Sequence, residues 1–285
     1  MLPDRPVPFA FGRFAVDLPP HASLRGRQQA IAHLPVSAAP LAPGDDIAAI
    51  RRRILDDKRS LTPPRGAPSA IVSDRMLLAD MVSVIHHDDP EYPGSIAMEA
   101  ARIAGGTAFT IRGGNSIDRA AALEDAASRI GAAIVPTLAP DPPEPGFAID
   151  RGVVAMPMYW QESAECLFDL PDGATLALQS HSNGDVLPRS LLEKQALVAP
   201  RLLSMGIPAA PRREGPRLLA DLPGEELVLQ SPTGVLLQWE YVGKPRSGED
   251  PQVTIRLELG EGAELAPALP AWDAFLSSFR RRRST

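Results

Sequence analysis

The two halves of this sequence repeat one another, which limits the folds open to the chain. Residues 77–80 and residues 218–221 both read Leu-Leu-Ala-Asp, at an offset of 141 residues (218 − 77). Three more pairs of segments match in the same order: 17–24 with 169–176, 98–100 with 239–241, and 110–112 with 254–256. Segments that recur at a nearly constant spacing indicate a repeated structural unit. We therefore expect an internal duplication that gives two similar domains.

A proline-rich segment lies between the two repeats. Five of the eleven residues 136–146 are proline. Because proline fixes φ and lacks an N–H, this segment can neither continue a helix nor join the middle of a sheet. We expect a short, stiff linker over residues 139–145, between an N-terminal domain of residues 1–138 and a C-terminal domain of residues 146–285.

Each half is expected to contain two helices and several short strands. Asp45 and Asp46 are typical helix caps and begin an amphipathic helix that ends near Ser60. The other helices are expected over residues 117–130, 190–205 and 272–279. Strands are expected over residues 13–18, 76–86, 95–103 and 108–112, and then over 147–156, 165–170, 174–181, 217–220, 225–230, 235–242 and 252–259. The strands follow one another through short turns, which predicts the α+β class, with an antiparallel sheet in each domain and helices packed on it.

Composition excludes several classes of function. The chain has 29 Lys and Arg against 35 Asp and Glu, a net charge of −6, which argues against nucleic acid as the main partner. It contains no stretch of 18 apolar residues that would span a membrane, and no signal peptide is visible at the N-terminus. The single Cys166 excludes an intrachain disulfide and a cysteine-rich zinc site.

The densest polar cluster is His86-His87-Asp88-Asp89, and two interpretations of it stay open. Neighbouring strand residues point to opposite faces, whereas metal ligands must converge, so the cluster is typical of a strand that runs into an acidic loop. The alternative is a metal-assisted hydrolase that uses these four residues. Neither a Gly-x-Ser-x-Gly elbow nor a Gly-x4-Gly-Lys-Ser/Thr phosphate loop occurs. We therefore expect no catalytic residue, no metal and no cofactor, and hence a binding protein.

Two other charged features are interpreted as structural. Glu99 and Glu240 occupy matched positions in the two halves, which favours a duplicated architectural glutamate over a catalytic pair. The run Arg280-Arg281-Arg282-Arg283 is interpreted as the solvated end of a helix, where cations suit the helix dipole, rather than as a phosphate site.

Several motifs give the chain a resemblance to a known family. Near the N-terminus, Gly12-Arg13-Phe14 is followed by Asp17-Leu18-Pro19, similar to the opening strand of that family. The matching motifs of the C-terminal half are residues 146–150, residues 222–226, Gln238-Trp239-Glu240 with Gly243, Pro251, and residues 271–274. With these motifs in this order, the chain resembles the two-domain immunity proteins of type VI secretion that neutralise a phospholipase effector of the lipase class.

The resemblance implies a protein without enzymatic activity. Such a protein binds its cognate secreted phospholipase and clamps it with both domains, over the substrate entrance or the mobile lid. Members of the family usually act in the periplasm, and a cytoplasmic location is the alternative because no export signal is visible. Besides the hydrolase, the alternative function is a secretion adaptor or chaperone, which delivers its partner instead of inactivating it.

Two segments are expected to contact the effector. One is the turn-like loop of residues 88–94, and the other is the segment of residues 156–160. Met, Tyr and Trp are enriched at protein interfaces, although a buried core segment is an equally good interpretation of residues 156–160. The residues expected at the interface are Asp89, Glu91, Tyr92, Met158, Tyr159 and Trp160.

Overall fold

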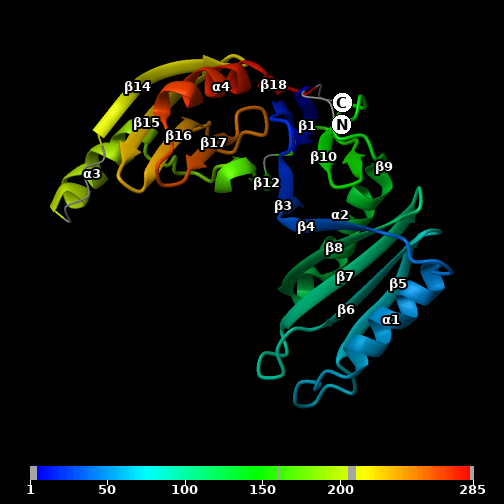
Figure 1. Cartoon of the computed structure of the whole chain (residues 1–285). Helices are drawn as coiled ribbons and strands as arrows, with labels where there is room; N and C mark the ends of the chain where they lie inside the picture. The colour runs from blue at the N-terminus through cyan, green and yellow to red at the C-terminus, as the bar shows by residue number, and fades with distance from the viewer. Residues whose placement is uncertain (1–4, 160, 205–209, 283–285) are drawn as a thin grey trace. The chain divides into compact units, whose positions relative to one another are not determined.

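The computed structural model describes residues 5–159, 161–204 and 210–282 (Figure 1). In these residues the protein has mixed α and β structure, with four helices and mostly antiparallel strands. The chain divides into two compact units. The central unit comprises Gln29–Pro157, and the terminal unit comprises the residues before it together with those from Met158 onward.

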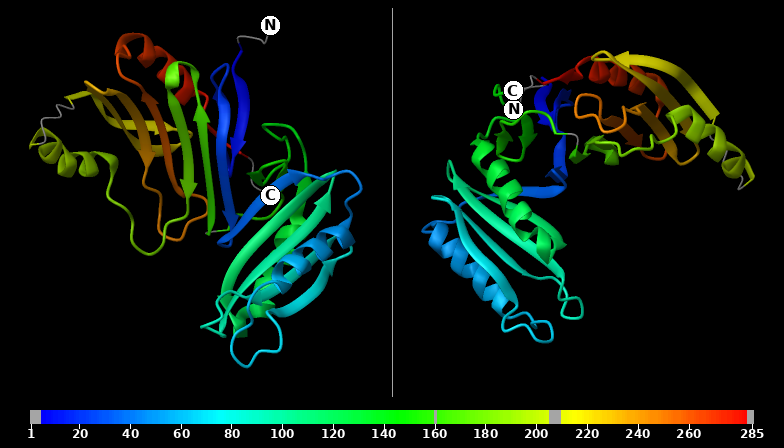
Figure 2. Two further views of the ribbon diagram at one scale, coloured as in Figure 1. Left: turned by 60° about the horizontal axis from the view of Figure 1, so that its bottom comes forward. Right: turned by 180° about the vertical axis from the view of Figure 1, so that it is seen from behind.

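The central unit is built on an antiparallel sheet with a helix on each face (Figure 2). In the order of their pairing, its strands are β4 (Leu34–Pro40), β8 (Thr107–Ser116), β7 (Ser95–Ala104), β6 (Met81–His87) and β5 (Ile71–Leu78). Helix α1 (Ile47–Arg59) packs on the face that carries Val82, and helix α2 (Ala120–Ala133) packs on the face that carries Met81. Because successive strand residues point to opposite faces, the two helices cover opposite sides of the sheet.

The terminal unit has a sheet of the same kind. In the order of their pairing, its strands are β14 (Ala210–Leu219), β15 (Leu222–Ser231), β16 (Gly234–Tyr241), β17 (Gln252–Leu259), β13 (Thr175–His181) and β12 (Glu162–Asp169), with β3 (Ser23–Ile31) next to β12. Helix α3 (Leu191–Ser204) contacts the sheet through Leu191, and helix α4 (Leu265–Ser277) buries Trp272 completely.

An ionic cluster of Arg213, Arg217, Glu226 and Asp273 fixes α4 to the terminal sheet. The buried Glu226 carboxylate accepts hydrogen bonds from Arg213 at 2.7 Å, from Arg217 at 2.8 Å and from the indole N–H of Trp272 at 2.6 Å. Both arginines also donate to Asp273, at 2.8 and 2.7 Å. Hydrogen bonding to Arg213 lowers the pKa of the Asp273 carboxyl below its ordinary value. The ionic cluster therefore joins β14, β15 and α4.

The two halves of the chain have the same order of elements. Each half contains two hairpins, a helix, four consecutive strands, a second helix and a short closing strand, from β1 to β9 in the first half and from β10 to β18 in the second. In each half, the strand before the first helix pairs with the last of the four consecutive strands, β4 with β8 and β13 with β17. The sequence repetition thus has a counterpart in the order of the elements.

The hairpin that opens each half pairs with the closing strand of the other half. The two small sheets are β1 (Val7–Phe11) and β2 (Phe14–Leu18) with β18 (Arg280–Arg281), and β10 (Phe147–Ile149) and β11 (Gly152–Val154) with β9 (Ile134–Pro136). Because of this exchange, the compact units do not coincide with residues 1–138 and 146–285. The proline-rich residues 139–145 form an irregular connection from β9 to β10 inside the central unit, where we expected a linker between domains.

Two expected elements differ from the structure. The strand expected over residues 76–86 is a hairpin of β5 and β6, because the chain turns at Asp80, whose carboxylate accepts a hydrogen bond from Arg102 at 3.1 Å. Two of the arginines expected at a helix end, Arg280 and Arg281, instead form β18, where the Arg280 guanidinium binds the Asp17 carboxylate at 2.9 Å, and Arg283 lies outside the described residues. In both cases the segment forms an ion pair with a residue far away in the sequence.

Candidate functional site

The loop between β6 and β7 presents an exposed tyrosine on an ordered turn. Tyr92 is 65% exposed. The Asp89 carboxylate accepts a hydrogen bond from the N–H of Glu91 at 2.7 Å, and the Tyr92 carbonyl accepts one from the N–H of Ser95 at 2.9 Å. The structure therefore brings these three expected interface residues together on one turn of the central unit.

The second expected segment lies where the chain passes from Pro157 of the central unit to Met158 of the terminal unit. Tyr159 is 38% exposed and Met158 is half-buried, whereas Trp160 lies outside the described residues. The N–H of Tyr159 donates a hydrogen bond to the Glu162 carboxylate at 3.0 Å. Glycine at position 248 allows the chain to pass closely, since a Cβ there would lie 3.0 Å from the Tyr159 carbonyl oxygen. The expected interface residues are thus divided between the two units.

A buried arginine holds the carboxylate that positions this segment. The Arg13 guanidinium binds both oxygens of Glu162, at 2.9 and 2.6 Å, and the two side chains are 5% and 7% exposed. A bidentate pair of this kind fixes both position and orientation. Arg13 therefore positions Tyr159 through Glu162. In the sequence Arg13 is only part of a motif, and no local pattern indicates a partner 149 residues away.

The matched glutamates both bind a lysine of the first helix in their half. The Glu99 carboxylate of β7 lies 3.7 Å from the Lys58 ammonium group of α1 and 3.4 Å from the Arg112 guanidinium. The Glu240 carboxylate of β16 lies 2.5 Å from the Lys194 ammonium group of α3. Each carboxylate thus joins a strand of the sheet to the first helix of its half, an arrangement in keeping with the architectural interpretation.

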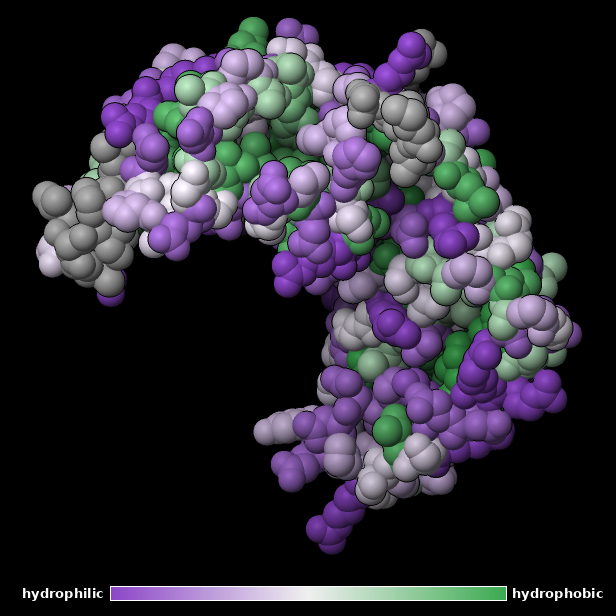
Figure 3. Space-filling model, viewed as in Figure 1, coloured by the Kyte–Doolittle hydropathy of each residue, from purple (hydrophilic) through white to green (hydrophobic). Residues whose placement is uncertain are grey.

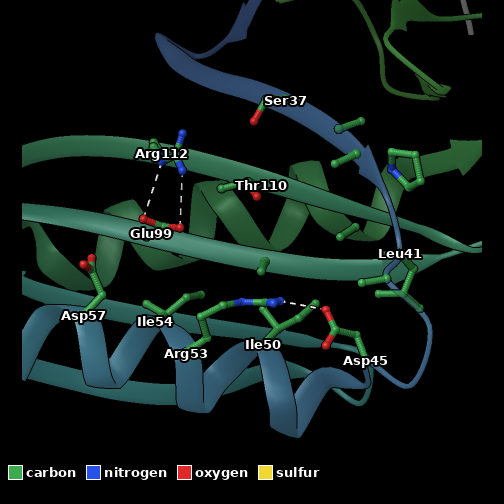
Figure 4. Close-up of a pocket in the computed structure, with 16 residues that line it drawn as sticks. Ser37, Leu41, Asp45, Ile50, Arg53, Ile54, Asp57, Glu99, Thr110 and Arg112 are labelled. Carbon is green, nitrogen blue, oxygen red and sulfur yellow. Dashed lines mark hydrogen bonds and ion pairs between the residues drawn. The ribbon is translucent and has the colours of Figure 1, made fainter.

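A groove runs beside α1 across one face of the central sheet (Figure 4). It has a volume of about 590 Å³ and lies between α1 and β4, over β7 and β8, with Thr110 and Glu99 on its floor. Its arginines are paired within the groove, Arg53 with Asp45 at 2.9 Å and Arg112 with Glu99 at 3.4 Å. Hydrophilic residues predominate near the loops of the central unit on the face shown in Figure 3. The groove is therefore a recess lined by hydrogen-bonding groups, and both of its arginines are neutralised by carboxylates.

The His86-His87-Asp88-Asp89 cluster does not converge. The imidazole Nδ1 of the buried His86 lies 2.9 Å from the His87 carbonyl oxygen, and Asp89 binds the loop backbone. In the described part of the chain, no three residues of the types His, Cys, Asp or Glu come together as metal ligands do. A search of the same residues finds no helix with the length and hydrophobicity needed to cross a membrane.

Comparison with known proteins identifies the class and the family. A family model described as the "Tle cognate immunity protein 4 C-terminal domain" matches residues 141–284, just over half of the chain, and so places the protein among the immunity proteins. The chain belongs to the Tle cognate immunity protein 4 (Tli4) family. The match begins inside the proline-rich segment that separates the repeats in the sequence. A search of curated proteins finds no match.

Three solved structures share the fold over nearly the whole chain. A chain from the crystal structure of the Tle4–Tli4 complex is 21% identical with a TM-score of 0.87, and all of both chains is covered. The apo structure of the type VI secretion immunity protein TplEi from Pseudomonas aeruginosa is 21% identical with a TM-score of 0.84, over 98% of both chains. The structure of TplEi complexed with an "L" peptide is 22% identical with a TM-score of 0.78, again over 98% of both.

Proposed function

We propose that this chain binds and inhibits a cognate phospholipase effector of a type VI secretion system, and that it clamps the effector with both units. Membership of the Tli4 family carries this proposal, and a chain of the Tle4–Tli4 complex has the same fold from end to end. On this view the chain is an inhibitor and not an enzyme. Its net charge of −6 complements a basic partner surface.

Inhibition follows from preferential binding to one state of the enzyme. Lipases of this class need an open lid at the membrane, and an inhibitor that binds the closed state more tightly shifts the population toward that state. Two units that contact the enzyme at separate places gain affinity over either alone, because the second contact is intramolecular once the first has formed.

Tyr92 and Tyr159 are proposed as the centres of the two effector contacts. Tyrosine is common among the residues that dominate binding energy, and both side chains are exposed on backbone that hydrogen bonds hold in place. Asp89 and Glu91 surround Tyr92, and Met158 precedes Tyr159. Trp160 belongs to the same proposal on sequence grounds.

Co-expression with a lipase-class phospholipase effector from the same genome tests the proposal. Size-exclusion chromatography and a phospholipid hydrolysis assay are expected to find a stable complex without hydrolysis. A complex that still hydrolyses phospholipid would identify a secretion adaptor instead, and two free proteins would refute effector binding. Tyr92→Ala is expected to weaken binding about tenfold or more. The control Met76→Ala removes another exposed apolar side chain of the central unit, 46% exposed, and is expected to bind normally.

The internal duplication is also proposed, as the origin of the two halves. Besides their shared order of elements, the opening hairpins match at an offset of 138 residues (147 − 9): residues 9–16 read Phe-Ala-Phe-Gly-Arg-Phe-Ala-Val, and residues 147–154 read Phe-Ala-Ile-Asp-Arg-Gly-Val-Val. In a crystal structure, the four consecutive strands of one half are expected to superpose on those of the other. Different registers of these strands would refute the duplication.

A periplasmic location is proposed as well, since an inhibitor of an incoming phospholipase must meet it where it attacks the membrane. Osmotic-shock fractionation of the producing cell is expected to release the protein with the periplasmic fraction. Recovery only with the cytoplasmic fraction would refute this location.

A further inference from the structure

The terminal unit has two connections that are longer than their counterparts in the central unit. Residues 242–251 join β16 to β17, whereas residues 105–106 suffice for the corresponding turn from β7 to β8. Residues 182–190 join β13 to α3, and the corresponding connection from β4 to α1 is the shorter segment 41–46. Hairpin loops usually have about 2–5 residues. Because the same order of elements closes without the extra length in the central unit, the fold does not require it.

The two long connections lie at the same end of the terminal sheet and contact each other (Figure 2). Asn183 and Pro245 form a single parallel β-bridge. The N–H of Arg246 donates to the Asn183 carbonyl at 3.1 Å, and the buried Asn183 amide group donates to the Val242 carbonyl at 2.6 Å. The Arg246 guanidinium also binds the Asp185 carboxylate, at 2.6 Å. Hydrogen bonds and an ion pair therefore hold the two connections together.

The segment that carries Tyr159 packs against both connections. A Cβ at Gly248 would lie 3.0 Å from the Tyr159 carbonyl oxygen and 3.2 Å from the Met158 Cβ. The Ser182 hydroxyl accepts a hydrogen bond from the N–H of Glu162 at 2.7 Å, and the Glu162 carboxylate in turn binds the N–H of Tyr159. All of these residues belong to the terminal unit. They form one terminal loop surface, made of residues 158–159, 182–190 and 242–251.

Several apolar side chains are exposed on the terminal loop surface. Val186 is 85% exposed, and Leu187 and Tyr159 are exposed as well. A single exposed apolar side chain is ordinary, whereas several on one surface indicate a place where another protein binds. Binding residues are also common on loops that a rigid scaffold holds in position. The exposed apolar residues therefore indicate a role for the extra loop length, which the fold itself does not require.

The charges of the terminal loop surface balance one another. Its three cations and three carboxylates are Arg189, Lys244, Arg246, Asp185, Glu249 and Asp250. Lys244 binds Asp250 at 2.7 Å, just as Arg246 binds Asp185. The loop between β6 and β7 differs, since residues 88–94 contain three carboxylates and neither Lys nor Arg. A surface without net charge complements an uncharged partner surface, whereas the acidic loop complements a basic one.

We propose that the terminal loop surface binds an uncharged, apolar surface of the effector, with Val186 as its most exposed apolar contact. Burial of apolar side chains away from water supplies the affinity of such a contact. The two units then recognise different chemistry on one partner, an apolar surface at the terminal unit and a basic surface at the loop that carries Tyr92. This inference rests on the proposed function and deepens it, because it names further contact residues and the chemistry of the surface that they bind.

A carboxylate placed on the terminal loop surface tests the proposal. Val186→Asp is expected to weaken effector binding tenfold or more, because the complex would bury an unpaired charge. The control Leu138→Asp makes the same change of charge in the proline-rich segment, where Leu138 is 76% exposed, and is expected to bind as the parent chain does. Both variants are expected to keep the urea midpoint of the parent chain. A lower midpoint for Val186→Asp would show that this side chain packs within the protein, and would overturn the proposal.

The salt dependence of binding distinguishes an apolar partner surface from a charged one. The loss of affinity in Val186→Asp is expected to be the same at about 50 mM and about 500 mM NaCl, because salt screens the repulsion between two charges and not the cost of burying one. A loss that disappears at the higher salt concentration would place an acidic effector surface here, and would overturn the proposal.

The same binding assay separates this inference from the proposed function. If the parent chain forms the complex and Val186→Asp binds as tightly as Leu138→Asp, the terminal loop surface is refuted as a contact while the proposed function stands. If the parent chain forms no complex with the effector, the proposed function fails, and this inference fails with it.

Discussion

Replacing Glu226 by glutamine is expected to destabilise the terminal unit strongly. The carboxylate accepts three hydrogen bonds, from Arg213, Arg217 and Trp272, and its side chain is only 7% exposed. Glu226→Gln keeps the shape but removes the charge. A hydrogen bond to a charged group contributes about 1 kcal/mol more than a neutral one, so three of them predict a loss of about 3 kcal/mol. Breaking a buried ion pair costs a similar amount, about 3–5 kcal/mol.

The matched control is Glu258→Gln in the same sheet. Glu258 pairs with Arg256, and both side chains are 49% exposed. Solvent screening keeps the contribution of such a pair below about 1 kcal/mol. Both variants replace a glutamate by glutamine, so the difference between their free energies of unfolding measures the effect of burying the carboxylate.

Urea unfolding followed by tryptophan fluorescence measures the difference, because Trp239 and Trp272 are both buried in this unit. Glu226→Gln is expected to lower the urea midpoint by about 1–3 M, with little change in the slope. Glu226→Gln could instead lower the free energy of unfolding no more than Glu258→Gln does. In that case the cost of desolvating the ionic cluster cancels the attraction between its charges, and the cluster does not stabilise α4 against the sheet.

Three more outcomes are expected. Trp239→Ala empties a fully buried site and is expected to cost about 3–5 kcal/mol in the same assay; a normal melting curve would contradict its place in the core. Because hydrogen bonding to Arg213 lowers the pKa of Asp273, its stabilising contribution is present above the ordinary pKa of about 4 and is lost as the pH falls through the lowered value. Asp273→Asn is therefore expected to lower the melting temperature at pH 7 and to reduce its fall between pH 4 and pH 2, and an unchanged acid profile would refute this coupling. Finally, a fragment of residues 29–157 is expected to resist trypsin while a fragment of residues 1–138 does not, because only the former keeps the whole central unit; equal resistance would argue against the exchange of hairpins.

Local signals in the sequence predict much of the secondary structure. The expected helix after Asp46 is α1, whose first turn is capped by the Asp46 carboxylate through the N–H of Ala49 at 2.7 Å. Gly105 and Gly106 separate β7 from β8 and both have positive φ, as glycines in a tight turn allow. The hairpin expected over residues 165–181 is β12 and β13. Caps and turns depend on a few neighbouring residues, so the sequence is sufficient for them.

The remaining strands depend on partners far away in the sequence. Strands β1, β3 and β4 were not expected. Pro8 disguises the pattern of β1, and Pro35 and Pro40 disguise that of β4. Strand β3 is mostly polar and exposed over residues 23–26, so it has no clear alternation. The exchange of hairpins is non-local as well, since Arg280 of β18 pairs with Ala15 of β2. No periodicity within one segment predicts which half supplies a strand's neighbour.

Local sequence signals predict one part of the candidate site and miss another. An exposed Tyr92 on an acidic turn follows from the run of Asp, Pro and Gly around it, and so does the prediction that this loop contacts a partner. The groove beside α1 has no such signal. Ser37 and Thr110 are unremarkable in the sequence, and only the pairing of β4 with β8 brings them together along the groove.

The pairing of β2 with β18 also determines when the protein can finish folding. Phe11 and Phe14 are almost fully buried, and Phe14 stacks on Phe279 with the ring centroids 5.2 Å apart. At a synthesis rate of about 5–20 residues per second, the ribosome makes Phe279 roughly 15–50 s after Phe14. Until then the first hairpin has no third strand and its aromatic rings remain uncovered. The terminal unit is therefore completed only after β18 has emerged from the ribosome, and the long sequence separation of its contacts predicts slow folding and a need for protection from aggregation in the meantime.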